Sequence, residues 1–217
     1  PINKYIMHKS GFNFEGHTDF LSSLSKKKKV PVMMLVTNEL KTLPLTIHVP
    51  LNKVPKLITK DLIHSKIKIA IKDLKTFFDI KKPSLIVTGL NPHAGENGDL
   101  GDEEIKVIKP AVDELKKITN LSITGPVSAD IAFSPDKRCN YDLAVCMYHD
   151  QALIPIKTLD FHNGVNVTLG LDFIRTSPDH GTGFEIVGKN IAKPQSLISA
   201  INLAHEMSKN KKNAKSI

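Results

Sequence analysis

The sequence predicts an α/β fold in which a largely parallel sheet is flanked by helices. Short apolar runs, such as 84–88 and 143–147, alternate with longer segments in which apolar residues recur every three or four positions. The short runs are typical of strands buried on both faces, and the longer segments are typical of amphipathic helices. Strands that alternate with helices in this way indicate a parallel sheet with helical crossovers.

The first half of the chain predicts two strands, a helix and a third strand. Residues 30–36 are nearly all apolar, as in a strand buried on both faces, and residues 45–49 form the second strand. In 61–78 the apolar side chains fall on one helical stripe. The run 84–88 is the third strand.

The second half begins with a helix whose start is marked by acidic residues. Asp102 is a good N-cap, and Glu103 and Glu104 fall in the first turn, where the helix dipole favours acids. The helix continues to Ile118, and Pro110 should kink or break it. Three further elements are an extended segment at 121–124, a strand at 143–147 and a helix at 196–207. No repeat, low-complexity linker or clear domain boundary is visible.

Length and composition indicate a soluble globular protein. The 217 residues allow one large domain or two small ones, and 41% hydrophobic with 24% charged residues is ordinary for this class. No apolar run is long enough to span a bilayer, so we expect no membrane partner. Cys139 and Cys146 offer neither a disulfide framework nor a CxxC motif, which favours the reducing cytoplasm.

Much of the net charge of +8 lies in two lysine clusters, at 26–29 and 209–215. Such clusters can bind nucleic acid through its phosphates, or they can be a solvated loop and a solvated terminus. They lack interleaved aromatic residues, the chain has no Trp, and no nucleic-acid-binding motif is present. We therefore expect no nucleic-acid partner, and a small anionic substrate is compatible with the basic balance.

Three histidines are candidates for metal ligands. The segments 89–96 and 147–151 each follow an apolar run, and they place His93 and His149 where strands should end and where ligands collect in α/β folds. His48 lies in a predicted strand. Three imidazoles suit Zn²⁺ and related ions and leave a position open for a substrate oxygen. Taken singly, each is more often a structural or surface histidine, and the sequence does not show that the three converge.

Other polar residues have two interpretations each. Thr18 can be the N-cap of a short helix, or His17 and Thr18 can donate hydrogen bonds to an anion at a helix start. Arg175 can grip a carboxylate or phosphate, with Asn166 near it in sequence, and Lys157 can act as a charge partner or an acid/base. The alternative is ordinary surface charge. No GxGxxG or Walker A motif is present, so a dinucleotide would bind without the Rossmann signature.

Seven segments, taken together and in order, resemble the 4-hydroxythreonine-4-phosphate dehydrogenases, a family of pyridoxal 5′-phosphate (vitamin B6) biosynthesis. They are Pro1–Lys4, Gly16–Asp19, Gly89–Glu96, Gly125–Asp130, Met147–Gln151, Gly164–Leu171 and Phe173–Thr182. The resemblance covers essentially the whole chain. It implies a fold like that of isocitrate and isopropylmalate dehydrogenases, in a two-domain homodimer with its active site at the subunit interface.

The resemblance also implies roles for particular residues. The divalent-metal ligands fall on His48, His93 and His149 and are shared between subunits. The residues that bind the substrate fall on His17, Thr18, Lys157, Asn166 and Arg175. The loop for NAD or NADP falls on His180, Gly181 and Thr182. Zn²⁺, Mg²⁺, Mn²⁺ and Co²⁺ are all compatible with this ligand set.

The implied reaction oxidises the secondary alcohol of 4-phosphohydroxy-L-threonine, with hydride transfer to NAD⁺ or NADP⁺. The β-keto acid then loses CO₂ to give 3-amino-2-oxopropyl phosphate. We expect Lys157 to be catalytic by assisting proton transfer. The chain departs from the family at Asp19, where Glu is usual, and at His162 and Asn163, where a Gly-Arg pair is familiar.

Residues 1–217 match the C-terminal two-thirds of such a dehydrogenase, so we expect a chain that lacks the N-terminal third. Two alternatives to the leading function follow. The chain is a paralogous dehydrogenase that acts on another phosphorylated or carboxylated hydroxy-acid, or it is an inactive truncated fragment that only dimerises and binds metal.

Overall fold

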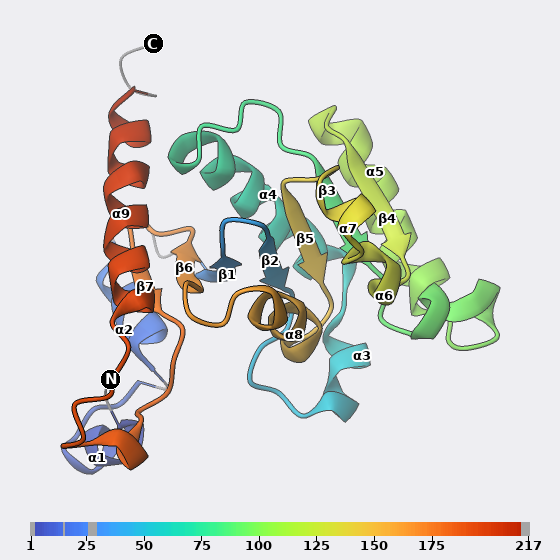
Figure 1. The fold of residues 1–217 in the computed structure, drawn as a ribbon. Helices are drawn as coiled ribbons and strands as arrows, with labels where there is room; N and C mark the ends of the chain where they lie inside the picture. Colours follow the sequence, from blue (N-terminus) through green and yellow to red (C-terminus); the bar gives the residue numbers. More distant parts are fainter. Residues whose placement is uncertain (1–2, 15, 26–29, 214–217) are drawn as a thin grey trace.

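The computed structural model describes residues 3–14, 16–25 and 30–213, and the lysine cluster at 26–29 lies outside them. Its centre is a sheet with the strand order β4-β3-β5-β2-β1-β6-β7 (Figure 1). The strands are β1 (Val32–Val36), β2 (Lys41–Pro44), β3 (Leu85–Thr88), β4 (Ile123–Val127), β5 (Leu143–Cys146), β6 (Val165–Leu169) and β7 (Thr176–Pro178).

Most strands of the sheet point the same way. Strands β4, β3, β5 and β2 pair in parallel, whereas β1 is antiparallel to both β2 and β6, and β7 is antiparallel to β6. Only β1 and β7 therefore run against the common direction of this sheet, and the predicted largely parallel α/β fold is confirmed. The carboxyl ends of β2, β3, β4 and β5 meet at one edge, which we call the carboxyl edge.

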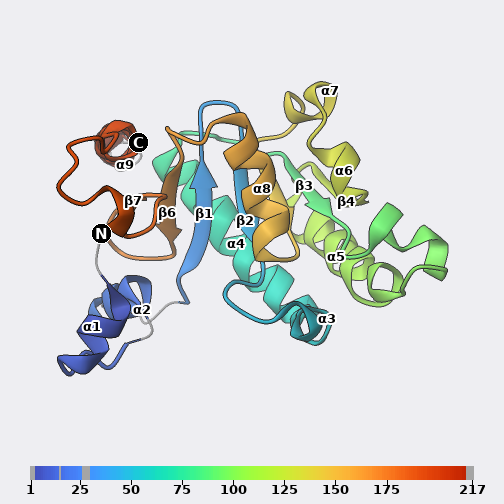
Figure 2. The same ribbon diagram turned by 60° about the horizontal axis from the view of Figure 1, so that its bottom comes forward.

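Helices cover both faces of the sheet. From the amino terminus they are α1 (Lys4–Lys9), α2 (His17–Leu24), α3 (Val54–Leu57), α4 (Lys60–Phe77), α5 (Lys109–Thr119), α6 (Ala129–Ala132), α7 (Pro135–Arg138), α8 (His149–Leu159) and α9 (Gln195–Asn213). Helix α8 lies in front of the sheet, and α4 lies behind it (Figure 2). Helices α1 and α2 lie beside the β6–β7 end of the sheet.

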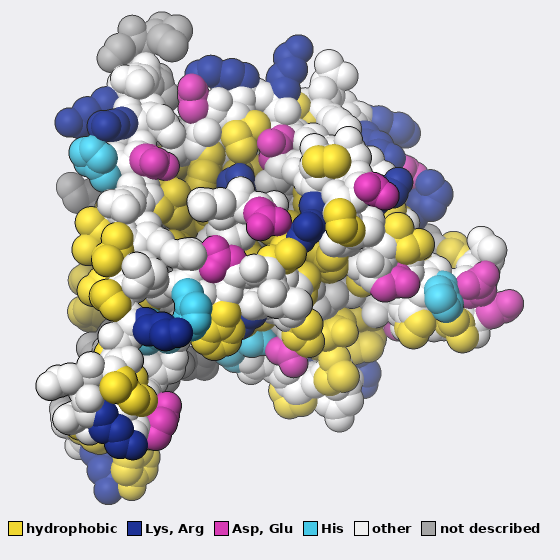
Figure 3. All heavy atoms as spheres, viewed as in Figure 1, with side chains coloured by type: hydrophobic (Ala, Val, Ile, Leu, Met, Phe, Trp, Pro, Cys, Tyr) yellow, Lys and Arg dark blue, Asp and Glu magenta, His cyan; other side chains and the backbone are white. Residues whose placement is uncertain are grey.

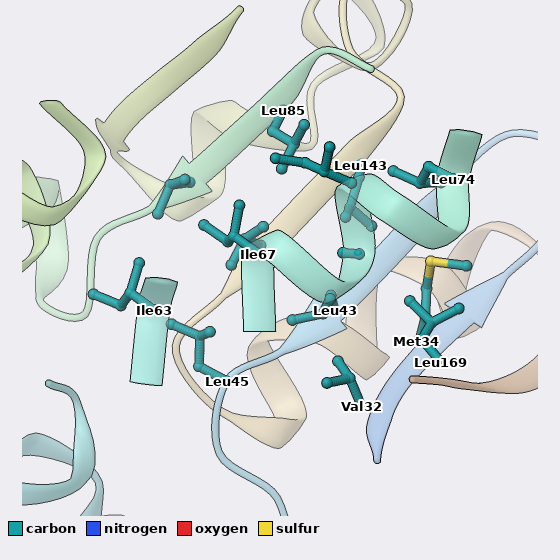
Figure 4. Close-up of a cluster of buried hydrophobic side chains, with 14 of the residues drawn as sticks. Val32, Met34, Leu43, Leu45, Ile63, Ile67, Leu74, Leu85, Leu143 and Leu169 are labelled. Atoms are coloured by element: carbon teal, nitrogen blue, oxygen red, sulfur yellow. The ribbon is translucent and has the colours of Figure 1, made fainter. Parts of the chain in front are cut away.

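The larger core lies between the sheet and α4, α5 and α9. Ile63, Ile67 and Leu74 of α4 face strand residues such as Leu43 and Leu143, and all five side chains are fully buried (Figure 4). Burial of one such side chain stabilises the fold by about 1.5–3 kcal/mol. The opposite face has a smaller core under α6 and α8.

The smaller core combines short and long side chains. The short ones are Ala132, Ala144, Cys146 and Ala152, and they pack among buried leucine and isoleucine residues. Burial raises the pKa of the Cys146 thiol far above its usual range, so this cysteine stays protonated and packs as a small apolar residue. Among the described residues, no helix is both long enough and apolar enough to cross a membrane.

Two predicted elements are wrong in detail. The second strand is Lys41–Pro44, not 45–49. The amide groups of Leu45 and Thr46 still donate to the β5 side of the sheet, but the chain then turns, and His48 has a positive φ of 52°. His48 is therefore in a bend that follows a strand, because the apolar alternation extends past the point where the backbone leaves the sheet.

The helix predicted from Asp102 to Ile118 is divided. A π-helix at Glu104–Ile108 precedes α5, and Pro110 lies in the first turn of α5, a position that tolerates proline. The chain therefore changes helix type before the proline instead of kinking at it. In α2 the N-cap position belongs to Gly16, not Thr18.

Candidate functional site

The carboxyl edge gathers the loops that carry the three candidate metal ligands. His48 follows β2, His93 follows β3 and His149 begins α8 directly after β5. Because β2, β5 and β3 are neighbours in the sheet, the three loops start side by side. Histidine side chains are visible at the surface around α8 (Figure 3).

His48 and His149 are neighbours, with ring centroids 5.7 Å apart. The Nδ1 atom of His149 lies 2.6 Å from Asp150 Oδ1. If Nδ1 carries the proton and donates it to this carboxylate, the lone pair of Nε2 remains for a metal ion. A carboxylate that orients an imidazole in this way is typical of metal-binding histidines. The donor types at this position therefore fit a divalent ion.

His93 lies apart from this pair, in a turn at Pro92–Gly98. The hydrogen bond from Ser128 Oγ, at 2.6 Å, and more weakly the charge on His93 hold the pKa of Asp130 below its usual range. His93 therefore lies toward the loop after β4. In the described ranges no three His, Cys, Asp or Glu side chains of one chain form a group that could hold a metal ion. Ligands shared between subunits stay a prediction.

Lys157 is in an ion pair two turns along α8 from His149. Its Nζ lies 2.9 Å from Asp179 Oδ2 and donates to the Asp179 carbonyl at 3.3 Å. It also lies 5.3 Å from the centre of the Phe161 ring. The rise of a helix separates positions 149 and 157 by about 12 Å. The structure of one chain therefore does not place the Lys157 ammonium beside the histidine pair.

Arg175 and Asn166 do come together. Arg175 donates to Thr168 Oγ1 at 3.1 Å and to Asn166 Oδ1 at 3.5 Å, and the contact with Asn166 is at the limit of a hydrogen bond. Burial lowers the pKa of the Arg175 guanidinium, which stays charged at neutral pH. Within the described residues Arg175 has no carboxylate partner. Its remaining donors can therefore bind an anion.

The remaining candidates are only partly placed. The side chains of His17 and Thr18 lie outside the described part of the structure, although their backbone begins α2. His180 is exposed, with Nδ1 3.0 Å from the Gly181 carbonyl, and Thr182 lies in the same irregular segment. This segment directly follows Asp179, so the Lys157 ion pair connects α8 to the predicted cofactor loop.

Sequence reasoning did not single out Gln151 and Glu104, which organise the carboxyl edge. Gln151 bonds to three groups at the ends of β3 and β5, and the buried carboxylate of Glu104 accepts three N–H groups of the loop after β3. The signal for Gln151 was its place in the 147–151 segment. Glu104 was explained by the helix dipole alone, and nothing local marks it as buried.

A separate cavity of about 550 Å³ lies over β3 and β4, under α6 and α7. Its lining includes Ile86, Thr124, Ile131 and Tyr141, and none of the predicted site residues. Burial raises the pKa of the Tyr141 hydroxyl to about 12, and this hydroxyl donates to the Ala132 carbonyl. We assign no role to this cavity.

The profile of the family described as pyridoxal phosphate biosynthetic protein PdxA matches residues 1–204. The chain belongs to this family. It is 49% identical over 211 residues to 4-hydroxythreonine-4-phosphate dehydrogenase of Methylorubrum extorquens strain PA1, covering 95% of this chain and 60% of that protein. It is 50% identical over 210 residues to the enzyme of the same name from Bradyrhizobium diazoefficiens, with coverage of 95% and 61%.

Solved structures of PdxA proteins have the same fold. The 4-hydroxythreonine-4-phosphate dehydrogenase of Klebsiella pneumoniae superposes with a TM-score of 0.85 at 39% identity, covering 96% of this chain and 63% of that one. A terephthalate 1,2-cis-dihydrodiol dehydrogenase of Burkholderia xenovorans LB400 gives 0.72 at 26% identity, with coverage of 95% and 64%. The resemblance found in the seven segments is confirmed, and the chain spans about 60% of the length of the curated relatives it matches.

Proposed function

We propose that the protein catalyses the NAD- or NADP-dependent oxidation of 4-phosphohydroxy-L-threonine in pyridoxal 5′-phosphate biosynthesis, in the cytoplasm. The product is a β-keto acid that decarboxylates to 3-amino-2-oxopropyl phosphate. The observation that carries this proposal is the pair of imidazoles, His48 and His149, at the carboxyl edge of a PdxA-family sheet. Open α/β sheets bind their ligands at the carboxyl ends of the strands, and this pair lies there.

His48, His93 and His149 would hold a divalent ion, with the three ligands shared between the subunits of a homodimer. Zn²⁺, Mg²⁺, Mn²⁺ and Co²⁺ are all compatible with imidazole ligands and substrate oxygens. When bound, the ion acts as a Lewis acid toward the hydroxyl and the later carbonyl oxygen, and the nicotinamide accepts the hydride. Asp150 orients the His149 ring through its 2.6 Å contact with Nδ1.

The positively charged residues bind the anionic substrate. Arg175, with Asn166 and Thr168 aligning it, presents its unpaired donors to a phosphate or carboxylate oxygen. Lys157 holds a proton at Nζ and can exchange it with the substrate once the ammonium leaves Asp179. His17 and Thr18 donate to the same anionic group, and the His180-Gly181-Thr182 segment binds the cofactor.

A second candidate is a paralogous dehydrogenase that acts on another hydroxylated substrate. The Burkholderia xenovorans structure favours it, because that protein shares the fold at 26% identity and its name gives a different substrate. The two candidates predict the same metal and cofactor residues and differ only in the groups that contact the substrate. A panel of phosphorylated and non-phosphorylated hydroxy-acids therefore separates them.

The first experiment is calorimetric titration of metal-stripped protein with Zn²⁺, beside His48→Ala, His93→Ala and His149→Ala. The matched control is His205→Ala, because His205 is exposed on α9. We expect one site per chain, strongly weakened by each of the three substitutions and unchanged by the control. NADH formation from 4-phosphohydroxy-L-threonine is measured next. Zinc binding that none of the three substitutions weakens would refute the proposed ligand set.

A further inference from the structure

The turn that carries His93 has an unusual backbone. Five consecutive residues, His93 to Asn97, have positive φ angles between 42° and 82°. Among them only Gly95 lacks a Cβ, and left-handed backbone is unfavourable for the other four. A run of this kind persists only where the surrounding structure holds it, and such runs cluster at functional sites.

The carboxylate of Glu104 is the group that holds the start of this turn. Its Oε1 accepts the N–H of Leu90 at 2.7 Å and the N–H of Asn91 at 2.8 Å, and its Oε2 accepts Asn91 Nδ2 at 3.0 Å. The Glu104 residue is only 3% exposed. A buried carboxylate that accepts three N–H groups fixes their positions strongly, because each bond is strengthened by the charge.

The turn is also packed directly against this carboxylate. A Cβ placed on Gly95 would lie 2.7 Å from Glu104 Oε2, and one on Gly89 would lie 3.0 Å from Oε1. Glu104 begins the π-helix at Glu104–Ile108. Such helices are rare in proteins, and those that occur are often at functional sites. The backbone type, the glycine packing and the hydrogen bonds therefore point to the same residue.

Gln151 ties this turn to the strand end that carries His149. Its Oε1 accepts hydrogen bonds from the Thr88 hydroxyl at 2.8 Å and from the N–H of Met147 at 2.7 Å. Its Nε2 donates a hydrogen bond to the Gly89 carbonyl at 2.9 Å. One amide thus joins the end of β3 to the end of β5. It satisfies polar groups at both ends, so the two loops cannot move apart without breaking these bonds.

We propose that Glu104 and Gln151 are positioning residues for the metal site: Glu104 sets the left-handed turn that presents His93, and Gln151 fixes that turn relative to the strand end that carries His149. Each chain then presents both histidines in a fixed relation to the sites that it shares with its partner. The inference rests on the proposed function, because it takes the two histidines as metal ligands. Neither residue contacts the metal or the substrate. Both act through the backbone that presents the imidazoles.

The test is a double-mutant cycle on Zn²⁺ affinity, measured by calorimetry on the metal-stripped chain. We expect Glu104→Ala to weaken Zn²⁺ binding about 10- to 100-fold, as loss of an orienting group near a metal ligand does. In a His93→Ala background the same substitution should have no further effect, because nothing remains for the turn to present. Equal losses in both backgrounds would mean a general structural role and would overturn the proposal.

Two further variants keep the test decisive. Glu104→Gln preserves volume and one acceptor oxygen, so it should recover most of the affinity lost in Glu104→Ala. If Glu104→Ala does not fold, Gln151→Glu takes its place in the cycle. Glu114→Gln makes the same change on the exposed face of α5, where Glu114 pairs with Lys60, and it should leave Zn²⁺ binding unchanged. Gln151→Glu removes the donor to Gly89 and should weaken binding only when His93 is present.

Hydrogen exchange separates failure of the inference from failure of the proposed function. The amides of Leu90 and Asn91 should be protected in the metal-free chain, and Glu104→Ala should release them while α4 and β5 keep their protection. Unchanged exchange at these amides would overturn the role of Glu104, whatever the metal result. If the unmodified chain binds no Zn²⁺, the proposed ligand set fails, and exchange alone decides whether Glu104 holds the turn.

Discussion

Glu104 and Lys66 are both charged residues inside the fold, but their surroundings differ. Glu104, 3% exposed, lies at the turn after β3 and accepts three N–H groups. Lys66, 7% exposed, lies in the middle of α4 and has no ion-pair or hydrogen-bond partner among the described residues. Burial alone lowers the pKa of Lys66 to about 8. Similar burial thus accompanies a satisfied charge in one region and an unsatisfied charge in the other.

The difference in hydrogen-bond partners separates a buried charge that organises structure from one that only lowers stability. A buried ion is tolerated when hydrogen bonds replace its hydration, and it is destabilising when they do not. At the carboxyl edge the donors around Glu104 define the geometry of a turn. In α4 the ammonium group defines nothing, and its aliphatic stem packs as an apolar side chain does. The following changes test that contrast, from the largest expected effect to the smallest.

Gly95→Ala should cause the largest loss, about 2 to 4 kcal/mol of unfolding free energy. The backbone at Gly95 has φ of +82°, and the new Cβ would lie 2.7 Å from both Glu104 Oε2 and the Gly101 carbonyl. Left-handed strain accounts for about 1 kcal/mol, and the overpacking adds about 1 to 3 kcal/mol. Urea denaturation followed by circular dichroism measures the change.

Gly188→Ala is the matched control for this prediction. Gly188 also has a positive φ, +76°, but nothing lies within 4 Å of a Cβ placed there. Gly188→Ala should therefore lower the unfolding free energy only by the backbone strain of about 1 kcal/mol. Equal losses for the two alanine variants would mean that Glu104 does not pack tightly against the turn.

Lys66→Met should stabilise the protein at pH 7, by about 2 kcal/mol. Burial holds the pKa of Lys66 at about 8 in the folded chain, below its ordinary value of 10.5. Between these two values the unfolded chain binds more protons, so stability rises with pH across this window and is lost as pH falls through about 8. The full pKa difference corresponds to about 3 kcal/mol.

Urea titrations at pH 7 and pH 10.5 measure this effect. The gain from Lys66→Met should be largest at pH 7 and small at pH 10.5, where Lys66 is neutral in the folded chain and about half protonated in the unfolded chain. Lys68→Met is the control, because Lys68 is exposed on the same helix and should change stability by less than about 0.5 kcal/mol at either pH. A loss of stability in Lys66→Met at pH 7 would show that the ammonium is satisfied.

The contrast between Glu104 and Lys66 also shows what the sequence could predict. The α/β fold and most elements followed from local periodicity, and so did the position of His93 and His149 at strand ends. These features depend on residues close together in the chain. The burial of Lys66 could also be predicted from the sequence. Lys66 lies four residues after Leu62 and four before Ala70, on the apolar stripe of α4.

The turn at His93–Asn97 and its contacts lay beyond sequence reasoning. Ala94 and Glu96 carry no signal for left-handed backbone. The hydrogen bonds that hold the start of the turn, at Leu90 and Asn91, come from a glutamate in the next helix. His48 was placed in a strand because its neighbours alternate, although the backbone leaves the sheet after Pro44. Convergence of His93 with the other two histidines depends on a second chain and stays a prediction.

Thr88→Val should cost about 1 kcal/mol and loosen the connection between β3 and β5. Thr88 is fully buried, and its hydroxyl donates to Gln151 Oε1 at 2.8 Å. Valine has the same shape, so the loss reports the hydrogen bond, and Gln151 Oε1 still accepts the N–H of Met147. Urea denaturation should show the loss, and in a Gln151→Leu background it should become smaller. An undiminished loss there would mean that the hydroxyl acts independently of Gln151.

Asp179→Asn should have the smallest effect on stability, below about 1 kcal/mol, because the Lys157–Asp179 pair is intermediate between the two buried charges. The two side chains are 32% and 17% exposed, so solvent screens their attraction and reduces its contribution. Lys157 keeps a bond to the Asp179 carbonyl in the variant, which limits the loss further. The stability change should disappear in a Lys157→Met background and should shrink at high salt. A loss well above 1 kcal/mol that persists in that background would place Asp179 with Glu104, as a carboxylate that holds backbone and not only a partner of Lys157.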